Sequence, residues 1–380
     1  LGPANFGIFE YLFSYVGVFF LFADFGTSYI FIRDYQQKEE KTKHINTFFS
    51  LKIVLSFIFS VLSMLGYVLA KKFDGFIFYL TFVLFYFLMN IEGFFEAFFI
   101  AIQKTEKKFF FNLAMSLTLF LFVVIGLAIY KNIKVVILSY LISACIGLFL
   151  AYLLLKKETT ISLFYEKSLV KYYLINGLPL VLFGLLGYIF FATDKIILGH
   201  LRPITDVGYY SLASRILAVL LVIPSLFNTA LYPYLAKKAS PESKTIIKSL
   251  FRLMLVASFT VGFLLSLFIF LSAPFLVTLF FGDQYLSSVK ILQVFVWIII
   301  FLFPTTFLDY FLISHNKQWL DFWITLIPAI LNIILNLILI PVYGVFGAVY
   351  ASISAQFLNF VLTFIASQRV LQQIYGIISK

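Results

Sequence analysis

Few of the 380 residues carry a charge, and cysteine and histidine are almost missing from the chain. Charged side chains make up 12% of the sequence, against about 25% in a soluble globular domain, which excludes a soluble enzyme, a nucleic-acid-binding domain and a disordered chain. The single cysteine, Cys145, cannot form an intrachain disulfide. The three histidines lie far apart, and no H-E-x-x-H motif or Cys/His cluster occurs. We therefore predict no metal site and no cofactor.

Hydrophobic residues, in contrast, form 62% of the sequence, and the mean hydropathy is +1.04. Because one bilayer-spanning helix needs about 20 apolar residues, the chain can fill about eleven spans. The short connecting segments leave no room for a soluble domain. The sequence predicts an all-α, polytopic membrane helix bundle whose visible spans lie near 6–33, 46–70, 75–103, 109–130, 133–155, 171–200, 207–235, 246–272, 285–314, 318–340 and 344–368.

The formal net charge of +11 is spread unevenly over alternate loops. If Leu1 lies outside, the cytoplasmic loops hold 19 of the 28 lysines and arginines and the outer loops hold 6. Cytoplasmic loops of membrane proteins carry such an excess of positive charge. The sequence therefore predicts a multi-pass protein of the cytoplasmic (inner) membrane, with Leu1 outside and the C-terminus in the cytoplasm, and gives no reason to expect nucleic acid as a partner.

Two stretches of the chain recur in the same order. Residues Leu1–Gly7 resemble Leu201–Gly208, and Glu96–Lys104 resemble Asp309–Lys317, where an acid precedes a lysine by eight residues each time. The second L-x-P follows a predicted span, so the repeat predicts a span before Leu1 as well. Parallel repeats of this kind are known in transporters.

The repeat predicts two pseudo-symmetric six-helix lobes around a central cavity. Residues 1–160 would form the N-terminal lobe, with five visible spans and an absent first helix, and residues 161–380 the C-terminal lobe with six spans. The complete bundle would then contain twelve helices.

Several motifs, in their order along the chain, resemble those of the polysaccharide-biosynthesis flippases, which belong to the multidrug/oligosaccharidyl-lipid/polysaccharide exporter superfamily. The resemblance covers nearly the whole chain, although the first helix of the family is absent. The motifs are Leu1–Phe9, Ala23–Ser28 followed by Arg33, Asp194–Gly199, Val207–Arg215, Leu231–Pro233, Phe281–Tyr285 and Leu331–Ala348.

The resemblance implies that the chain is no enzyme but a flippase of the O-antigen type. Its substrate would be a polyprenyl-diphosphate-linked oligosaccharide, moved across the membrane by alternating access. It also implies membrane lipid and polysaccharide-assembly proteins as partners. Composition and spacing alone do not identify this substrate.

Four cations inside or near predicted spans are candidate substrate-binding residues, because an ionisable group in a span usually faces a cavity or a partner. Arg33 and Lys52 lie towards the cytoplasmic ends of neighbouring spans, and Lys195 and Arg215 towards the outer ends of two later ones. Each could bind a diphosphate. The alternatives are anchoring at the membrane surface and, for Arg215, an ion pair with Asp194.

Four acids are candidate cavity or coupling residues. Asp24, Glu92, Glu96 and Asp309 all lie in the inner halves of spans, and Glu92 and Glu96 share one helix face. Acids in such positions suit coupling to a proton or cation gradient. The alternative is a closed network in which Lys52 or Arg33 neutralises an acid.

Two other functions are compatible with a membrane helix bundle. A drug or small-molecule antiporter of the same superfamily would share the repeat and would tolerate an acidic cavity. A membrane oligosaccharide polymerase, ligase or glycosyltransferase would need a sizeable outer loop or an acidic metal-binding motif, and the sequence has neither. The cations favour an anionic, lipid-linked substrate.

Overall fold

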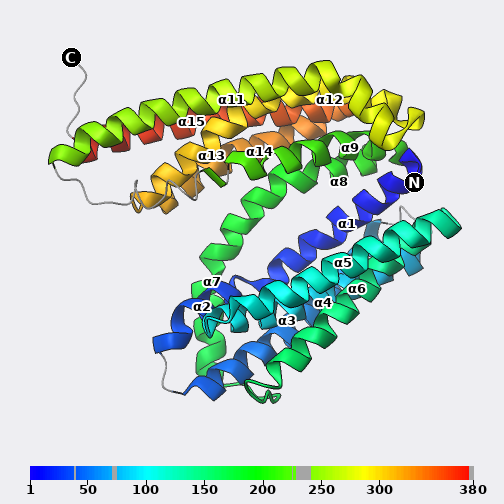
Figure 1. Cartoon of the computed structure of the whole chain (residues 1–380), viewed down its shortest axis with the longest axis vertical. Helices are drawn as coiled ribbons and strands as arrows, with labels where there is room; N and C mark the ends of the chain where they lie inside the picture. Colours follow the sequence, from blue (N-terminus) through cyan, green and yellow to red (C-terminus); the bar gives the residue numbers. More distant parts are fainter. Residues whose placement is uncertain (38–39, 71–74, 225, 228–240, 376–380) are drawn as a thin grey trace. The chain divides into compact units, whose positions relative to one another are not determined.

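A computed structural model describes residues 1–37, 40–70, 75–224, 226–227 and 241–375, and every regular element among them is a helix. Eleven of the described helical segments are long and apolar enough to cross a membrane, in agreement with the eleven predicted spans. Within each unit the long helices run side by side (Figure 1). The α-helices are α1 (Pro3–Asp24), α2 (Thr27–Asp34), α3 (Lys41–Ala70), α4 (Phe76–Ala101), α5 (Thr105–Tyr130), α6 (Ile133–Leu155), α7 (Lys167–Tyr188), α8 (Asp194–Leu201), α9 (Ile204–Leu220), α11 (Pro241–Phe281), α12 (Leu286–Phe295), α13 (Ile299–Ser314), α14 (Gln318–Tyr343) and α15 (Val345–Tyr375).

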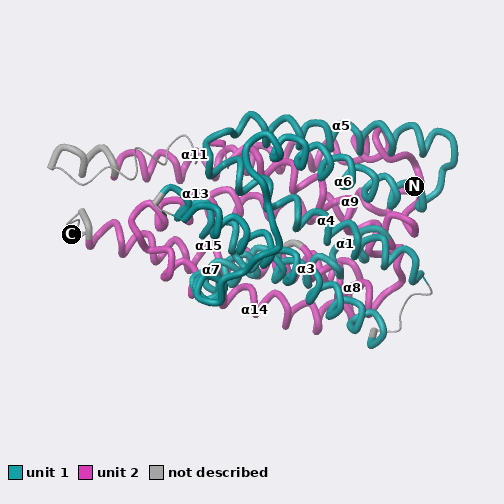
Figure 2. Tube along the Cα trace, turned by 90° about the horizontal axis from the view of Figure 1, so that it is seen from below, with its two compact units in different colours: residues 1, 9–188 teal, residues 2–8, 189–380 magenta. Residues whose placement is uncertain are grey.

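The chain forms two compact units, which Figure 2 shows in different colours. One unit contains Leu1 and Phe9–Tyr188, and the other contains Gly2–Ile8 and Ile189–Lys380. We call them unit 1 and unit 2. Their boundary falls inside the predicted sixth span and not at residue 160, so the units do not coincide with the lobes expected from the repeat, which remain a prediction.

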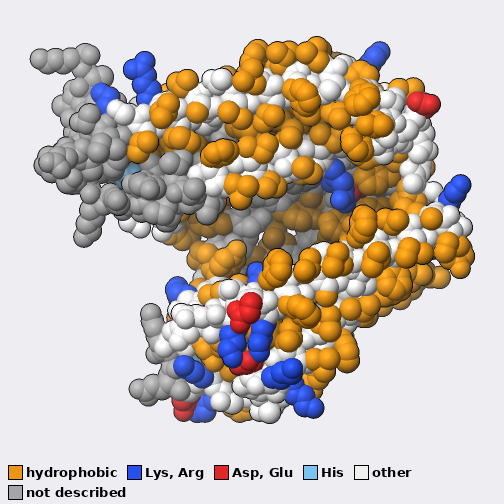
Figure 3. Space-filling model, in the orientation of Figure 1, with side chains coloured by type: hydrophobic (Ala, Val, Ile, Leu, Met, Phe, Trp, Pro, Cys, Tyr) orange, Lys and Arg blue, Asp and Glu red, His pale blue; other side chains and the backbone are white. Residues whose placement is uncertain are grey.

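Apolar side chains cover most of the outward surface of the helices. On α5 they lie on every side, and Phe120, Leu121 and Ile125 are among the exposed ones. In the space-filling view, hydrophobic side chains dominate the visible face, and charged ones gather in a few places (Figure 3). A helix that is apolar all round is suited to lipid, because a bilayer leaves no water for exposed polar groups.

Breaks interrupt the helix in the first and the sixth predicted spans, and a 3-10 turn at Val296–Ile298 interrupts the ninth. The first breaks at Phe25 and Gly26, which both have positive φ angles (49° and 65°), so that α2 starts afresh at Thr27. The sixth passes through a π-helical turn at Ile189–Thr193 between α7 and α8. The membrane-crossing segment Pro3–Asp34 nevertheless includes the first break, in agreement with the predicted first span. π-Turns and breaks of this kind often lie at functional sites.

Glycine allows two very close helix crossings. In unit 2, a Cβ on Gly7 would overlap the carbonyl oxygen of Ile204, and a Cβ on Gly208 would overlap that of Pro3. The two contacts are reciprocal and involve residues of the Leu1–Gly7 and Leu201–Gly208 repeat. In unit 1, Gly177 of α7 packs in the same way against the break beside Gly26.

The second repeat also has a matching backbone. Gln103 lies two residues after the end of α4 and Asn316 two residues after the end of α13, 213 residues apart, and their φ angles are 60° and 59°. The amide of the next residue donates to a helix carbonyl in both turns, Lys104 to Phe99 (2.8 Å) and Lys317 to Leu312 (2.9 Å). The helices that follow, α5 and α14, each have 26 residues. The α4–α5 and α13–α14 hairpins are thus structural equivalents.

Candidate functional site

Unit 1 contains an ion pair inside the membrane-spanning helices. The ammonium of Lys52 on α3 donates to Asp24 Oδ1 at the end of α1 and to Asn90 Oδ1 on α4, the latter at 3.1 Å. Asp24 also accepts from Ser28 Oγ at 2.6 Å. The structure thus brings two predicted site residues together in an ion pair.

The helix break explains why the acid and the lysine meet. Asp24 is the last residue of α1, where unpaired carbonyls give the helix end a partial negative charge that favours a nearby cation. The hydroxyl of Thr27 satisfies one of these carbonyls by donating to Asp24 O at 2.6 Å. The side chain of Lys52 is only 1% exposed, whereas that of Asp24 is 35% exposed. Asp24 is therefore the accessible partner of a buried cation.

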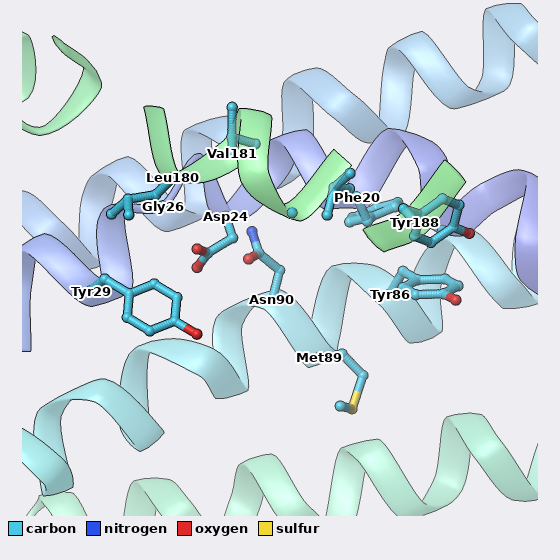
Figure 4. A pocket seen from close by; sticks show the side chains of 13 residues that line it. Phe20, Asp24, Gly26, Tyr29, Tyr86, Met89, Asn90, Leu180, Val181 and Tyr188 are labelled. Carbon is cyan, nitrogen blue, oxygen red and sulfur yellow. The ribbon is translucent and has the colours of Figure 1, made fainter. Parts of the chain in front are cut away.

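Asp24 borders a cavity of about 460 Å³ in unit 1. Figure 4 shows Asp24 and Asn90 close together on its wall, with aromatic rings around them. Asp24 is the only charged residue that lines this cavity in the described chain. Lys52 lies behind the wall, where it donates to the two lining residues Asp24 and Asn90. The other lining residues are mainly aromatic or aliphatic, and include Phe20, Tyr29, Tyr86, Met89 and Tyr188.

Arg33 does not join this network. Its guanidinium donates to its neighbour Asp34 at 2.6 and 3.2 Å and to the hydroxyl of Tyr172 at 3.1 Å. The same hydroxyl donates to Asp34 at 2.6 Å, which ties α2 to α7. The Arg33 side chain is 57% exposed. A ligand could therefore reach Arg33 without breaking the pair of Lys52 and Asp24.

Glu92 and Glu96 lie on one face of α4 but differ in their surroundings. Glu96 accepts from Asn112 at 2.6 Å and lies 3.3 Å from the ammonium of Lys108 on α5. Glu92 is 2% exposed, and neither of its oxygens has a hydrogen-bond partner in the described chain. Gly147 of α6 makes room for it, since a Cβ there would lie 2.8 Å from Glu92 Oε1.

In unit 2, the structure contradicts the expected ion pair of Asp194 and Arg215. Asp194 is 1% exposed and accepts hydrogen bonds from Tyr210, Ser352 and Asn336, the last at 2.6 Å. Arg215 is exposed, with its guanidinium 5.9 Å from the ring centroid of Phe6. Lys195 is partly exposed beside Asp194 on α8.

The Oδ1 atom of Asp309 on α13 is buried and has no hydrogen-bond partner in the described chain, and the same is true of the Oδ1 atom of Asp321 on α14. Asp321 was not among the predicted residues, because its only sequence signal is an acid in the first turn of a helix, where acids are common.

A charged cluster lies between α5 and the segment after α6. Glu158 accepts from the ammonium groups of Lys104, at 2.6 Å, and Lys107. These two hydrogen bonds hold the pKa of Glu158 below its ordinary value. The cluster joins two loops on one side of unit 1, the side that the charge count predicts to be cytoplasmic.

Comparisons with known proteins agree with the fold and with the family resemblance. The model of a family described as "Polysaccharide biosynthesis protein" matches residues 1–239, and that of the MatE family matches residues 179–338. The capsular polysaccharide biosynthesis protein CapF of Staphylococcus aureus is 24% identical over 278 residues, which cover 70% of this chain and 69% of CapF.

Two solved structures share the fold over nearly the whole chain. An inward-facing MATE multidrug resistance transporter of the MOP superfamily has a TM-score of 0.77 at 13% identity, with 100% of this chain and 93% of that one covered. The lipid II flippase MurJ, in an inward closed conformation, has a TM-score of 0.75 at 15% identity, with 98% and 84% covered. Both likenesses concern the fold alone.

Proposed function

This chain belongs to the polysaccharide biosynthesis protein family, a group of MOP-superfamily membrane transporters, and we propose that it flips a polyprenyl-diphosphate-linked oligosaccharide across the cytoplasmic membrane. The observation that carries the proposal is a buried cation behind the wall of a membrane-embedded cavity, in a chain whose family model matches residues 1–239. An ammonium held at that depth suits a diphosphate, because charge-assisted hydrogen bonds are strong where water is scarce.

The ion pair suggests how binding and coupling are linked. In this proposal the ammonium of Lys52 binds either Asp24 or a substrate phosphate, but not both anions at once. Protonation of Asp24 weakens its hold on Lys52 and frees the ammonium for the diphosphate. Release of that proton restores the pair and displaces the substrate. In this scheme a proton gradient drives transport. Alternating access exposes the substrate-bound cavity first to one side of the membrane and then to the other.

The other predicted residues take subordinate roles in this proposal. Arg33, at the end of the same span and exposed, makes a first contact with the anionic headgroup. Lys195 and Arg215 attract the anion at the opposite end of the path, and Glu92, Glu96 and Asp309 contribute to coupling. The chain has Leu1 outside and its C-terminus in the cytoplasm, and it works beside polysaccharide-assembly proteins.

A drug antiporter is the second candidate, and one observation favours it. The cavity wall carries one acid, Asp24, among aromatic side chains, and such a combination suits an organic cation as well. The MatE match over residues 179–338 agrees with either function.

Transport in proteoliposomes separates the two functions. The purified chain is reconstituted with a fluorescent polyprenyl-diphosphate oligosaccharide, and a membrane-impermeant reductant reports which leaflet holds the label. We expect flipping by the wild type, at least a tenfold loss in Lys52→Ala and a smaller loss in Arg215→Ala. Lys134→Ala, at the exposed start of α6, is the matched control. Unchanged flipping in Lys52→Ala and Arg215→Ala at equal protein levels would rule out the cationic site, and ethidium transport without lipid flipping would favour the antiporter.

A further inference from the structure

A second cavity of unit 1, of about 510 Å³, lies between α3, α4 and α6, and we call it the α6 groove. Phe95 of α4 lies at its floor and is 2% exposed, whereas Phe149 and Tyr152 of α6 form an exposed rim (61% and 45%). No charged residue lines it in the described chain, and it shares no lining residue with the cavity beside Asp24. The α6 groove is thus a separate, apolar recess that opens on the surface of the unit.

One stripe of α6 supplies half of the groove lining and ends in a cation. Cys145, Phe149 and Tyr152 follow one another at intervals of four and three residues, and Lys156 comes four residues after Tyr152. Residues at these intervals lie on one face of a helix. Lys156 is the C-cap of α6 and keeps helical backbone angles (φ −54°, ψ −22°). It therefore lies one turn beyond Tyr152, at the end of the apolar stripe.

Two positive charges at this end of the groove are not compensated. Lys156 and its neighbour Lys157 are both exposed, and neither forms an ion pair within the described residues. Glu158, the acid that follows them, already accepts from Lys104 and Lys107. The end of the groove thus presents two ammonium groups to an anion.

The segment after α6 closes this end of the groove. Ile161 lines the groove, and the next residues are fixed along α3. The backbone amides of Ser162, Phe164 and Glu166 donate to the side chains of Asn46, Ser50 and Thr47, at 3.0, 3.1 and 3.2 Å. A segment with its amides satisfied tolerates surroundings with little water, and an exposed tyrosine such as Tyr165 beside lysines is typical of the membrane surface. This end of the groove therefore lies at the level of lipid headgroups.

The length of the stripe matches the depth of one leaflet. Cys145 and Lys156 are 11 residues apart, which corresponds to about 16 Å along a helix. Half of the hydrocarbon core of a bilayer is about 15 Å thick. With Lys156 at the membrane surface, Cys145 lies near the middle of the bilayer, and the groove follows the acyl-chain region of one leaflet.

We propose that the α6 groove binds one molecule of an anionic phospholipid, with an acyl chain in the groove and the phosphate at Lys156 and Lys157. Such a lipid combines an apolar chain of the right length with a negative charge at its end. Ammonium groups form charge-assisted hydrogen bonds with phosphate, and anionic lipids give the cytoplasmic leaflet its negative potential. The charge count predicts this end of α6 to be cytoplasmic. The inference stands whether or not the chain transports a lipid-linked sugar.

Cys145 can report the occupancy of the groove, because it is the one cysteine of the chain and lines the groove. The full chain is purified in detergent micelles, and the rate at which N-ethylmaleimide alkylates Cys145 is measured while phosphatidylglycerol is added. We expect a saturable fall in this rate. Phosphatidylcholine, whose headgroup has no net charge, should protect Cys145 much less at the same mole fraction. Equal protection by the two lipids would overturn the proposal.

The same assay tests the two lysines. In Lys156→Gln/Lys157→Gln the half-saturating mole fraction of phosphatidylglycerol should rise about 25-fold, because each lysine near an anionic lipid contributes a factor of about five. Lys131→Gln/Lys134→Gln is the matched control, since it removes two exposed lysines at the opposite end of the α5–α6 hairpin. It should leave the value unchanged. An unshifted value in Lys156→Gln/Lys157→Gln would refute the phosphate contact.

A photoreactive phosphatidylglycerol, with a diazirine at the end of one acyl chain, distinguishes this site from the general lipid shell. At one lipid per protein, peptide mapping should find the label on α4 and α6 near Cys145. The exposed apolar side chains of α5 represent the general lipid-facing surface and should remain unlabelled. Labelling of α5 to the same extent would overturn the proposal. So would displacement of the label by an equal mole fraction of a polyprenyl phosphate, because the groove would then bind a carrier lipid instead.

Discussion

The different burial of Lys52 and Asp24 predicts that removal of the acid lowers the free energy of unfolding more than removal of the lysine. Asp24→Ala leaves the Lys52 ammonium, 1% exposed, with Asn90 Oδ1 as its remaining acceptor in the described chain. Removal of one partner of a buried ion pair costs about 3–5 kcal/mol. Because Asn90 still accepts a hydrogen bond from the ammonium, we expect the lower end, about 3 kcal/mol.

Removal of the lysine should cost less. Lys52→Met keeps most of the side-chain volume and leaves Asp24 with the hydroxyl of Ser28 and with access to the cavity. A partly solvated carboxylate that loses one donor costs about 1–2 kcal/mol. In the double variant Asp24→Ala/Lys52→Met neither charge remains, so the loss should be well below the sum, with a coupling free energy of about 2 kcal/mol.

Reversible unfolding in mixed micelles, with sodium dodecyl sulfate as the denaturant and tryptophan fluorescence as the signal, measures all four chains of this cycle. Two results would refute the reasoning. One is a loss in Lys52→Met equal to or larger than that in Asp24→Ala. The other is additivity of the two single losses, which would mean that the charges do not interact in the folded protein.

Three further outcomes can be checked. Gly208→Ala should destabilise the protein by about 1–3 kcal/mol, because the new Cβ overlaps the Pro3 carbonyl, whereas Gly187→Ala, where a Cβ meets nothing within 4 Å, should not destabilise it in the same unfolding assay. The lowered pKa of Glu158 means that its stabilising effect is present above its ordinary pKa of about 4.3 and is lost as the pH falls through the folded value; thermal unfolding of Glu158→Gln should therefore lose less stability than the wild type towards pH 4. In intact cells, after the native cysteine is replaced by serine, a membrane-impermeant maleimide should label Lys131→Cys and not Lys156→Cys, and the reverse pattern would invert the proposed orientation.

Hydropathy was sufficient to predict the number of spans, because each one needs a long apolar run and the loops between them are short. It could not predict the breaks within spans. Phe25 in a left-handed conformation has no sequence signal, and the π-turn at Ile189–Thr193 consists of ordinary helix-forming or apolar residues.

The candidate site was predictable only in part, for a related reason. An ionisable residue at membrane depth is visible in the sequence, and so Lys52 and Asp24 were identified. Their partner Asn90 comes from a third helix, and nothing in a single sequence relates it to them. The ion pair of Asp194 and Arg215 was wrong for the same reason, because Tyr210, Asn336 and Ser352 on three other helices donate to the oxygens of Asp194.

The left-handed turns at Gln103 and Asn316 bear on how the protein evolved. Neither residue is glycine, yet both turns keep one backbone geometry. The flanking positions have changed in the meantime, because Glu96 and Lys108 form an ion pair and the residues 213 positions later, Asp309 and Asp321, are both acids. After a gene duplication, a preserved turn would have left each copy of the hairpin free to acquire its own chemistry. A chimera in which residues 99–108 replace 312–321 should therefore fold, and would show whether the two copies are still interchangeable parts.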